Sequence, residues 1–215
     1  MPRYRWGARV YDLLSMERLV YRPGRRAAID GLRLRAGDRV LDVGCGTGLN
    51  LPYLDSAIGA AGEVVGVDAS GAMLRQARRR VDRHGWSNVT LVEGDAGLLD
   101  SLVTGDFDAV LFTYSLSVIG DWRGAWARAW TRLRPGGRVA VVDTSLPVGP
   151  WRLLSPLARL ALFSGGVHAS RQVWQQVLSD AEQTTYQVLN GGHVQVAAGI
   201  KPSMTAERPM AKDAG

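Results

Sequence analysis

Three stretches in the first half of the sequence combine residue types that could bind a small charged ligand. In the first, VLDVGCGTG, an apolar run contains Asp42 and is followed by Gly44, Gly46 and Gly48. Glycine weakens the interior of a strand or a helix, so three glycines in five residues indicate a loop that turns sharply and lets a ligand approach the main chain. A pyrophosphate favours a loop without a nearby carboxylate, whereas Asp42 favours a cationic ligand.

The other two stretches each end in an aspartate. Asp68 closes VVGVD, and a carboxylate there can accept hydrogen bonds from both hydroxyls of a ribose. Asp95 closes VEGD, and it could accept from the exocyclic amine of adenine while the backbone N–H of Ala96 donates to a ring nitrogen. Each aspartate alone could equally cap a helix. A glycine loop and two acids at three successive strand ends are harder to explain by capping, so the pattern predicts a nucleoside site.

The spacing of the glycines distinguishes between two nucleoside cofactors. A dinucleotide-binding loop reads G-x-G-x-x-G, whereas here the third glycine comes one residue early. A Tyr-x-x-x-Lys pair, which would support a nicotinamide oxidoreductase, is missing, because the only lysines are Lys201 and Lys212. S-Adenosylmethionine fits better, since it carries an ammonium and a sulfonium but no phosphate. An NAD-dependent oxidoreductase and a non-catalytic nucleoside-binding module are the alternatives.

Alternating strands and helices must position these residues. Near-continuous apolar runs rich in valine predict strands that are covered on both faces of a parallel sheet. A helix is predicted from Ser70 to a stop at Gly85, and another from Asp121 to a stop at Pro135–Gly137. The five predicted strands occupy residues 39–43, 63–68, 89–95, 107–113 and 138–144.

The pattern changes after residue 144. Residues 145–169 contain an apolar stretch with interspersed arginines, which we interpret as a lid over the acceptor or as an ordinary core helix. A last helix is predicted at 170–181, and strands at 184–190 and 193–200 flank a hairpin turn at Gly191–Gly192. The predicted fold class is therefore α/β, with a doubly wound, seven-stranded, mostly parallel Rossmann-like sheet whose last strand is antiparallel. We expect one domain over residues 1–200 and a disordered tail over 201–215.

Residues 38–144 closely resemble the class I S-adenosylmethionine-dependent methyltransferases. The resemblance rests on five ordered motifs: VLDVGCGTG, VVGVDAS, VTLVEGDA, FDAVLFTYSLSVI and LRPGGRVAVVD. It implies methyl transfer from S-adenosylmethionine, with the glycine loop at the methionine part, Asp68 at the ribose and Asp95 at the adenine. It also implies that Met73 packs against the nucleoside and that the Thr113–Tyr114 backbone lies near the methionine amine. The expected cofactor-binding residues are Asp42, Gly44, Cys45, Gly46, Gly48, Asp68, Ala69, Met73, Asp95, Ala96, Thr113 and Tyr114.

The acceptor is expected to be a small molecule or a lipid. The segment VYDLLSMERLVYRPGRRAAIDGLRL resembles the N-terminal helices of small phospholipid N-methyltransferases and quinone-biosynthesis C-methyltransferases. This resemblance implies a catalytic role for Tyr11, and His168, which follows the lid-like stretch, is the second candidate. Many relatives carry a histidine pair after the fourth strand, where this chain has Leu116–Val118. A head-group amine needs no base, whereas a quinone carbon or a phenol oxygen would use Tyr11, Asp143 or His168.

Charge and cysteine usage set the expected partners and location. The net charge of +6 lies in residues 1–35, which we expect either to contact an anionic membrane or to be a solvated basic face. The run after the fourth strand lacks the Asn/Asp-Pro-Pro-aromatic motif of nucleic-acid methylases, so no nucleic-acid partner is expected. We interpret Cys45, His84 and His193 as structural, and no metal is expected. The single cysteine and the absence of a long apolar run predict a cytoplasmic enzyme, and the basic segment leaves membrane association as an alternative.

Overall fold

The computed structural model describes residues 21–146 and 171–203. Tyr11, His168, nearly all of the lid-like segment and most of the C-terminal tail lie outside the described residues. Within the described ranges, no helix combines the length and the apolar composition needed to cross a bilayer.

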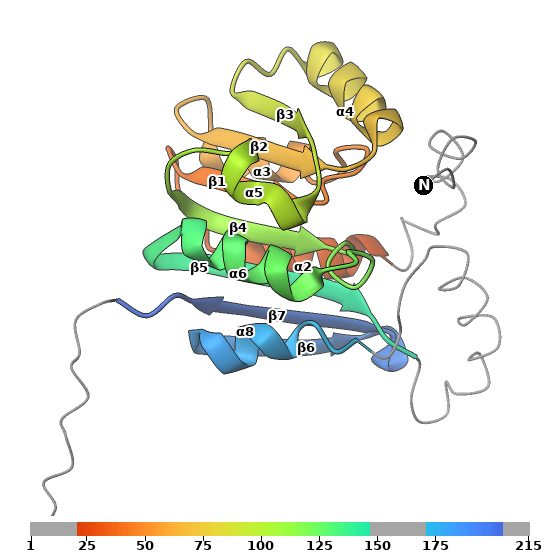
Figure 1. Cartoon of the computed structure of the whole chain (residues 1–215), viewed down its shortest axis with the longest axis vertical. Coiled ribbons are helices and arrows are strands. Elements are labelled where there is room, and N and C mark those ends of the chain that lie inside the picture. Colours follow the sequence, from red (N-terminus) through yellow and green to blue (C-terminus); the bar gives the residue numbers. More distant parts are fainter. Residues whose placement is uncertain (1–20, 147–170, 204–215) are drawn as a thin grey trace, which may run out of the picture.

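A seven-stranded sheet forms the centre of the molecule (Figure 1). Its strand order is β3-β2-β1-β4-β5-β7-β6, and neighbours pair in parallel except that β7 runs antiparallel to both β5 and β6. The fold class predicted from the sequence is therefore confirmed, including the antiparallel last strand. The strands are β1 (Arg39–Val43), β2 (Glu63–Asp68), β3 (Val89–Glu93), β4 (Phe107–Thr113), β5 (Leu133–Thr144), β6 (Glu182–Leu189) and β7 (Val194–Ile200).

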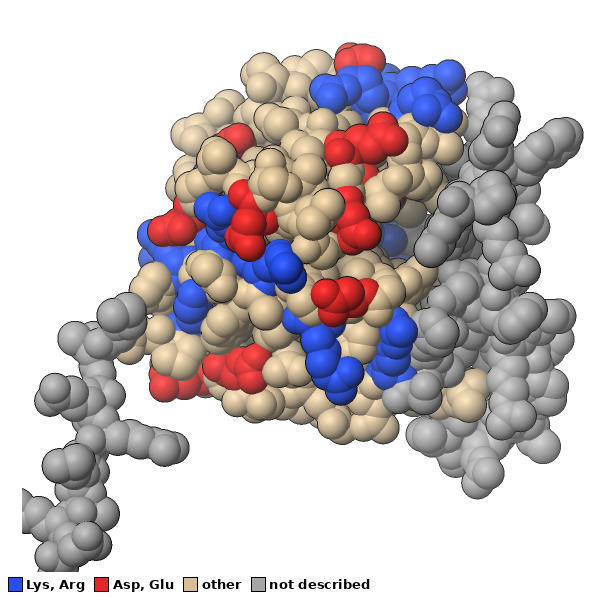
Figure 2. Space-filling model, in the orientation of Figure 1, with Lys and Arg blue, Asp and Glu red and all other residues tan. Residues whose placement is uncertain are grey.

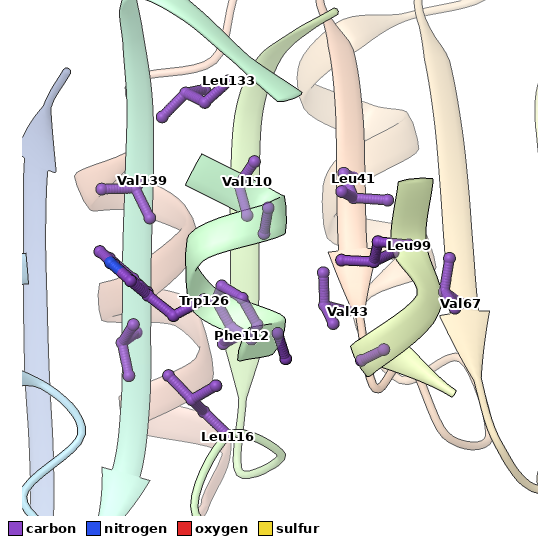
Figure 3. Close-up of a cluster of buried hydrophobic side chains, with 14 of the residues drawn as sticks. Leu41, Val43, Val67, Leu99, Val110, Phe112, Leu116, Trp126, Leu133 and Val139 are labelled. Carbon is purple, nitrogen blue, oxygen red and sulfur yellow. The ribbon is translucent and has the colours of Figure 1, made fainter. Parts of the chain in front are cut away.

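Helices cover both faces of the sheet (Figure 1). One hydrophobic core joins the sheet to α2, α3 and α4, and the other joins it to α5, α6 and α8. Figure 3 shows part of the second core, where Phe112 of β4 meets Trp126 of α6 with ring centroids 5.9 Å apart. The helices are α2 (Arg22–Gly31), α3 (Leu51–Ile58), α4 (Gly71–His84), α5 (Leu99–Leu102), α6 (Trp122–Arg132) and α8 (Gln175–Asp180), with 3-10 turns η2 (Ala96–Leu98) and η4 (Asn190–Gly192).

The predicted helix starts at Ser70 and Asp121 are confirmed. The Ser70 hydroxyl accepts from a backbone N–H of the first turn of α4, and the Asp121 carboxylate does the same for α6. The predicted stop of α4 is also confirmed, because Gly85 adopts a left-handed conformation with φ +68°. These caps hold the helices so that their first turns lie just beyond the carboxyl ends of the strands.

Several boundaries differ from the prediction, and the largest differences are at the starts of β5 and α8. Strand β5 begins at Leu133 rather than at residue 138, because Leu133 pairs with Phe107 and buries its side chain in the core. The Lys201 ammonium stabilises this transition by donating to the carbonyls of Trp130 and Leu133 at 2.7 Å each. Helix α8 begins at Gln175, so it is shorter than the periodicity over 170–181 predicts.

The order of the strands predicts a crevice at one edge of the sheet. The chain winds outward from β1 through β2 to β3, then returns to β4 on the other side of β1. In open sheets of this kind, ligands bind outside the carboxyl ends of the strands at such a reversal. The glycine loop follows β1 at this edge, where the carboxyl ends of β2, β3 and β4 also lie.

Candidate nucleoside and acceptor site

The three loop glycines are needed for two different reasons. All three have positive φ, with values of +73° for Gly44, +56° for Gly46 and +77° for Gly48. A Cβ on Gly44 would lie 2.4 Å from the Cβ of Ser115, and one on Gly48 would lie 2.8 Å from Cδ1 of Leu51. A Cβ on Gly46 would meet no described atom within 4 Å. Packing therefore requires two of the glycines, and Gly46 is the one whose main chain borders open space.

Asp68 connects the end of β2 to the glycine loop. Its Oδ2 accepts from the Gly46 N–H at 2.8 Å, and its Oδ1 accepts from the Ser70 N–H at 2.8 Å. Burial raises the pKa of Asp68, and these two backbone hydrogen bonds oppose the shift, while the nearby Glu93 adds to it. Each carboxylate oxygen has a second lone pair, so Asp68 can still accept from two ligand hydroxyls.

The other predicted nucleoside contacts lie close to the ends of β2 and β3. Asp95 is exposed, and its Oδ1 accepts from the Gly97 N–H at 2.8 Å as the N-cap of η2. Ala69 is exposed, whereas Met73 and Ala96 are buried at 7 % exposure each. The capping role that the sequence left open for Asp95 is therefore present, and its contact with adenine stays a prediction.

A buried polar network lies beneath the glycine loop. Asp42 is fully buried, and both of its oxygens accept from the Asn50 side-chain amide at 2.8 Å. The same amide donates to Thr113 Oγ1 at 2.7 Å, and Asn50 Oδ1 accepts from the buried Arg25 guanidinium. Burial raises the pKa of Asp42 to about 6, although the Asn50 hydrogen bond and the Arg25 charge oppose this. Both Asp42 oxygens are thus occupied by Asn50, and a contact between Asp42 and a ligand stays a prediction.

Cys45 is a packing residue at this loop, as the sequence was interpreted. Cys45 is 5 % exposed, and its side chain packs against Gly66 of β2. A Cβ added to Gly66 would lie only 3.0 Å from the Cys45 Sγ. Burial raises its thiol pKa well above the ordinary range, and the carboxylates of Asp42 and Asp68 add to the effect. The thiol is thus protonated at neutral pH and is a poor nucleophile.

The loop after β4 closes the other side of the crevice. Tyr114 has a φ of +54°, and its hydroxyl donates to the Tyr21 carbonyl at 2.7 Å. The two tyrosine rings meet edge to face with centroids 4.9 Å apart. This contact ties the start of α2 to the end of β4, where the Thr113–Tyr114 backbone is predicted to lie near the methionine amine.

Asp143 holds this loop in place. Its carboxylate accepts from the Ser117 N–H at 3.0 Å, the Ser117 hydroxyl at 2.8 Å and the Thr144 N–H at 2.8 Å. Arg171 supports the same loop by donating to the carbonyls of Ser117 and Ile119. Since Asp143 is 1 % exposed and already accepts three hydrogen bonds, its geometry suits support of the loop better than base catalysis.

The free energy of unfolding is expected to increase as the pH falls from 7.5 to 5. Burial raises the pKa of both Asp42 and Asp143 to about 6 from an ordinary value of 3.8. Between these values the folded chain keeps protons that the unfolded chain has released, so stability is lost as the pH rises from 3.8 to 6. Each group should contribute about 1 kcal/mol over the measured range, which urea unfolding at the two pH values would detect. Asp143→Asn should remove the part of this pH-dependent gain in the free energy of unfolding that Asp143 contributes. A wild-type free energy of unfolding that falls between pH 7.5 and pH 5 would contradict the assignment.

Sequence reasoning missed Arg25 and Asn50, which complete the buried network. A polar residue at the end of the glycine loop was a usable signal for Asn50. Arg25 is one of nine arginines in its segment, and nothing local distinguishes it from the others. Within the described ranges, no group of three or more His, Cys, Asp and Glu residues could hold a metal ion.

Comparison with known proteins identifies relatives of this chain. The family described as "Methyltransferase domain" matches residues 40–137. The chain is 31 % identical over 219 residues to the ubiquinone/menaquinone biosynthesis C-methyltransferase UbiE of Ectopseudomonas mendocina, covering 89 % of this chain and 84 % of that protein. It is 33 % identical over 146 residues to the aklanonic acid methyltransferase DauC of Streptomyces sp. strain C5, covering 68 % of this chain and 65 % of that protein.

A solved structure shares the fold. The Haemonchus contortus phosphoethanolamine N-methyltransferase 2 in complex with S-adenosyl-L-methionine matches with a TM-score of 0.67 and 17 % identity. The match covers 83 % of this chain and 52 % of that one. At this identity, the likeness concerns the arrangement of the sheet and helices.

Proposed function

The chain belongs to the S-adenosylmethionine-dependent methyltransferase family, and we propose that it methylates a ring carbon of a hydroxylated aromatic small molecule, such as a quinol. The observation that carries this proposal is the 31 % identity to a quinone-biosynthesis C-methyltransferase over 89 % of the chain. The relative named for aklanonic acid supports the same choice of a small molecule.

The residues at the crevice fit S-adenosylmethionine. Gly46 leaves its main chain open to a ligand, and Asp68 beside it has lone pairs for ribose hydroxyls. Asp42 and Asp68 give this edge a negative potential that favours a cationic ligand. When bound, the cofactor supplies a methyl group on a positively charged sulfur, which is already activated for transfer. The protein therefore has to align the acceptor and exclude water, and alignment of this kind can lower a barrier by about 7–11 kcal/mol.

The acceptor is proposed to bind over the ends of β4 and β5. The nucleoside residues lie at the ends of β1, β2 and β3, on one side of the crevice. On the other side, Tyr21, Tyr114 and His193 bring three rings close together, with 4.9 Å between the tyrosine centroids and 6.2 Å between those of Tyr21 and His193. Aromatic faces suit a flat acceptor ring.

A phospholipid head-group amine is the second candidate. Residues 10–34 resemble phospholipid N-methyltransferases as well as quinone-biosynthesis C-methyltransferases, and an amine needs only a neutral lone pair rather than a base. Methyl transfer from labelled S-adenosylmethionine distinguishes the two classes. We expect the full-length chain to label 1,4-dihydroxynaphthalene on a ring carbon under reducing conditions and to leave phosphoethanolamine unlabelled. Label on phosphoethanolamine alone, or on neither compound, would reject the proposed acceptor.

Peripheral contact with an anionic membrane is proposed through the exposed face of α4. Arg75, Arg78, Arg79 and Arg83 are exposed on this helix, and basic side chains gather over it at the upper right of Figure 2. The carboxyl edge of the sheet lies at the first turn of the same helix, so a membrane here would lie beside the crevice. Arginines near an anionic surface contribute about 1 kcal/mol each.

The triple variant Arg75→Glu, Arg78→Glu and Arg79→Glu is expected to lose at least tenfold in binding to phosphatidylglycerol vesicles, measured by co-sedimentation at low salt. A control with the same change of charge on α6 and β5 replaces Arg123, Arg128 and Arg134 by Glu and should keep more of the binding. Equal loss in both variants, or wild-type binding that ignores anionic lipid content, would reject α4 as the contact surface.

A further inference from the structure

His193 lies at the same edge of the sheet as the nucleoside residues. It directly precedes β7, and the Ser145 N–H that follows β5 donates to its carbonyl at 2.8 Å. Because β7 runs antiparallel to β5, the start of β7 lies at the carboxyl ends of the parallel strands. The imidazole is therefore two strands away from the end of β4, on the side of the crevice assigned to the acceptor.

The hydrogen bonding of the ring defines its proton. Nδ1 of His193 lies 2.6 Å from the carbonyl oxygen of Ser145. A carbonyl oxygen can only accept, so we assign the hydrogen of the neutral ring to Nδ1. Nε2 then carries the lone pair, and it has no hydrogen-bond partner among the residues that the structure describes. A half-buried imidazole held in this tautomer can take a proton from a ligand.

The surroundings of the ring are fixed by close packing. A Cβ on Gly24 of α2 would lie 2.4 Å from the Tyr114 hydroxyl and 2.6 Å from Cγ1 of Val194. Helix α2 thus packs directly against Val194, the first residue of β7. The Tyr21 ring, which precedes α2, lies beside the His193 ring with 6.2 Å between the centroids. The groups that titrate or carry charge around this cluster are Tyr21, Tyr114, the Arg25 guanidinium over the Tyr114 ring and the buried Asp143.

We propose that His193 is the general base for a phenolic acceptor, an inference that rests on the proposed function. Nε2 takes the proton of the acceptor hydroxyl, and the freed electron pair increases the electron density at the adjacent ring carbon. That carbon forms a bond to the methyl group, and the electron pair of the broken carbon–sulfur bond stays on sulfur. The ring carbon then releases its hydrogen to water as a proton, and the imidazolium returns its proton to the oxygen. The net reaction releases one proton to solvent.

The variant His193→Asn tests this role. The Asn amide can replace Nδ1–H as the donor to the Ser145 carbonyl, but it supplies no base at the position of Nε2. We expect kcat with 1,4-dihydroxynaphthalene to fall about 10²–10⁴-fold, because no other group takes the place of Nε2. S-Adenosylmethionine binding by calorimetry should be unchanged. His84→Gln, at an exposed histidine stacked on Trp86, is the matched control and should keep the wild-type rate.

A second measurement needs neither turnover nor a variant. The chain has three histidines, so their ring carbon–hydrogen signals can be followed by NMR in the full-length wild type. Adding 4-nitrophenol should shift the His193 signal toward its protonated position and increase the absorbance of bound phenolate. A wild-type rate in His193→Asn, or a His193 signal that does not respond to the phenol, would overturn the proposal. Failure of the wild type to methylate any phenol would instead reject the proposed function.

Discussion

Replacement of Asp68 by Ala is expected to weaken S-adenosylmethionine binding about 100-fold. A hydrogen bond to a charged group contributes about 1.5–3 kcal/mol, and we assign two ribose hydroxyls to this carboxylate. Loss of about 3 kcal/mol corresponds to roughly two orders of magnitude in Kd. The variant also removes the acceptor that holds the Gly46 N–H at 2.8 Å, so the loop itself loses a support.

A matched control separates binding from loss of a carboxylate. Asp38 is 7 % exposed, and its Oδ2 accepts from the Arg35 N–H at 2.8 Å. It directly precedes β1, at the opposite edge of the sheet from Asp68. Asp38→Ala should therefore lower the free energy of unfolding without changing the Kd for S-adenosylmethionine in calorimetry. An unchanged Kd in Asp68→Ala would reject the ribose assignment.

Replacement of Gly46 by Ala is expected to abolish most binding while the chain stays folded. The residue has φ +56°, a conformation that costs a non-glycine residue about 1–2 kcal/mol. The added methyl would meet no described atom within 4 Å, so the protein itself has room for it. The methyl occupies the space that we assign to the cofactor, and a loss of at least thirtyfold in affinity should follow, or about 2 kcal/mol.

Gly37 provides the control for this prediction. It has φ +88°, and a Cβ there also meets no described atom within 4 Å. Gly37 lies before β1, away from the crevice. Gly37→Ala should therefore lower the free energy of unfolding through its left-handed backbone but leave the affinity for S-adenosylmethionine unchanged. Gly44→Ala should behave differently from both, since its Cβ would collide with Ser115 and destabilise the fold. Equal affinities in Gly46→Ala and Gly37→Ala would show that the open space at Gly46 is not the cofactor path.

The glycine loop and Asp68 could be predicted because their signals are local. Each lies directly after a valine-rich strand, and parallel strands bring their carboxyl ends to one edge. The same reasoning could not distinguish Gly46 from Gly44, because that difference depends on Ser115, which is far away in sequence.

The buried network and the candidate base depend on contacts that no local pattern contains. Asp42 is charged at the end of an apolar run, which suggests a ligand contact, but the fold covers it with Asn50. Its partner Arg25 comes from α2, and that pairing exists only once α2 packs on the sheet. His193 reads as the first residue of a strand, and it lies at the carboxyl edge of the parallel strands because β7 pairs antiparallel with β5.

The extent of β5 shows how tertiary pairing overrides local signals. Pro135–Gly137 is a strong stop for the preceding helix, and it predicts a loop before the strand. The chain nevertheless enters the strand at Leu133, because this side chain is needed in the core beside Phe107. Helix α6 therefore ends at Arg132, before the stop that Pro135–Gly137 predicts.

The central claim is that S-adenosylmethionine lies across the carboxyl ends of β1 and β2. A crystal structure of the full-length chain with S-adenosylhomocysteine tests it most directly. The account predicts both ribose hydroxyls within hydrogen-bond distance of Asp68, and the ligand chain passing over the Gly46 main chain. A ligand bound elsewhere, with Asp68 contacting Gly46 and Ser70 but no ribose, would contradict it.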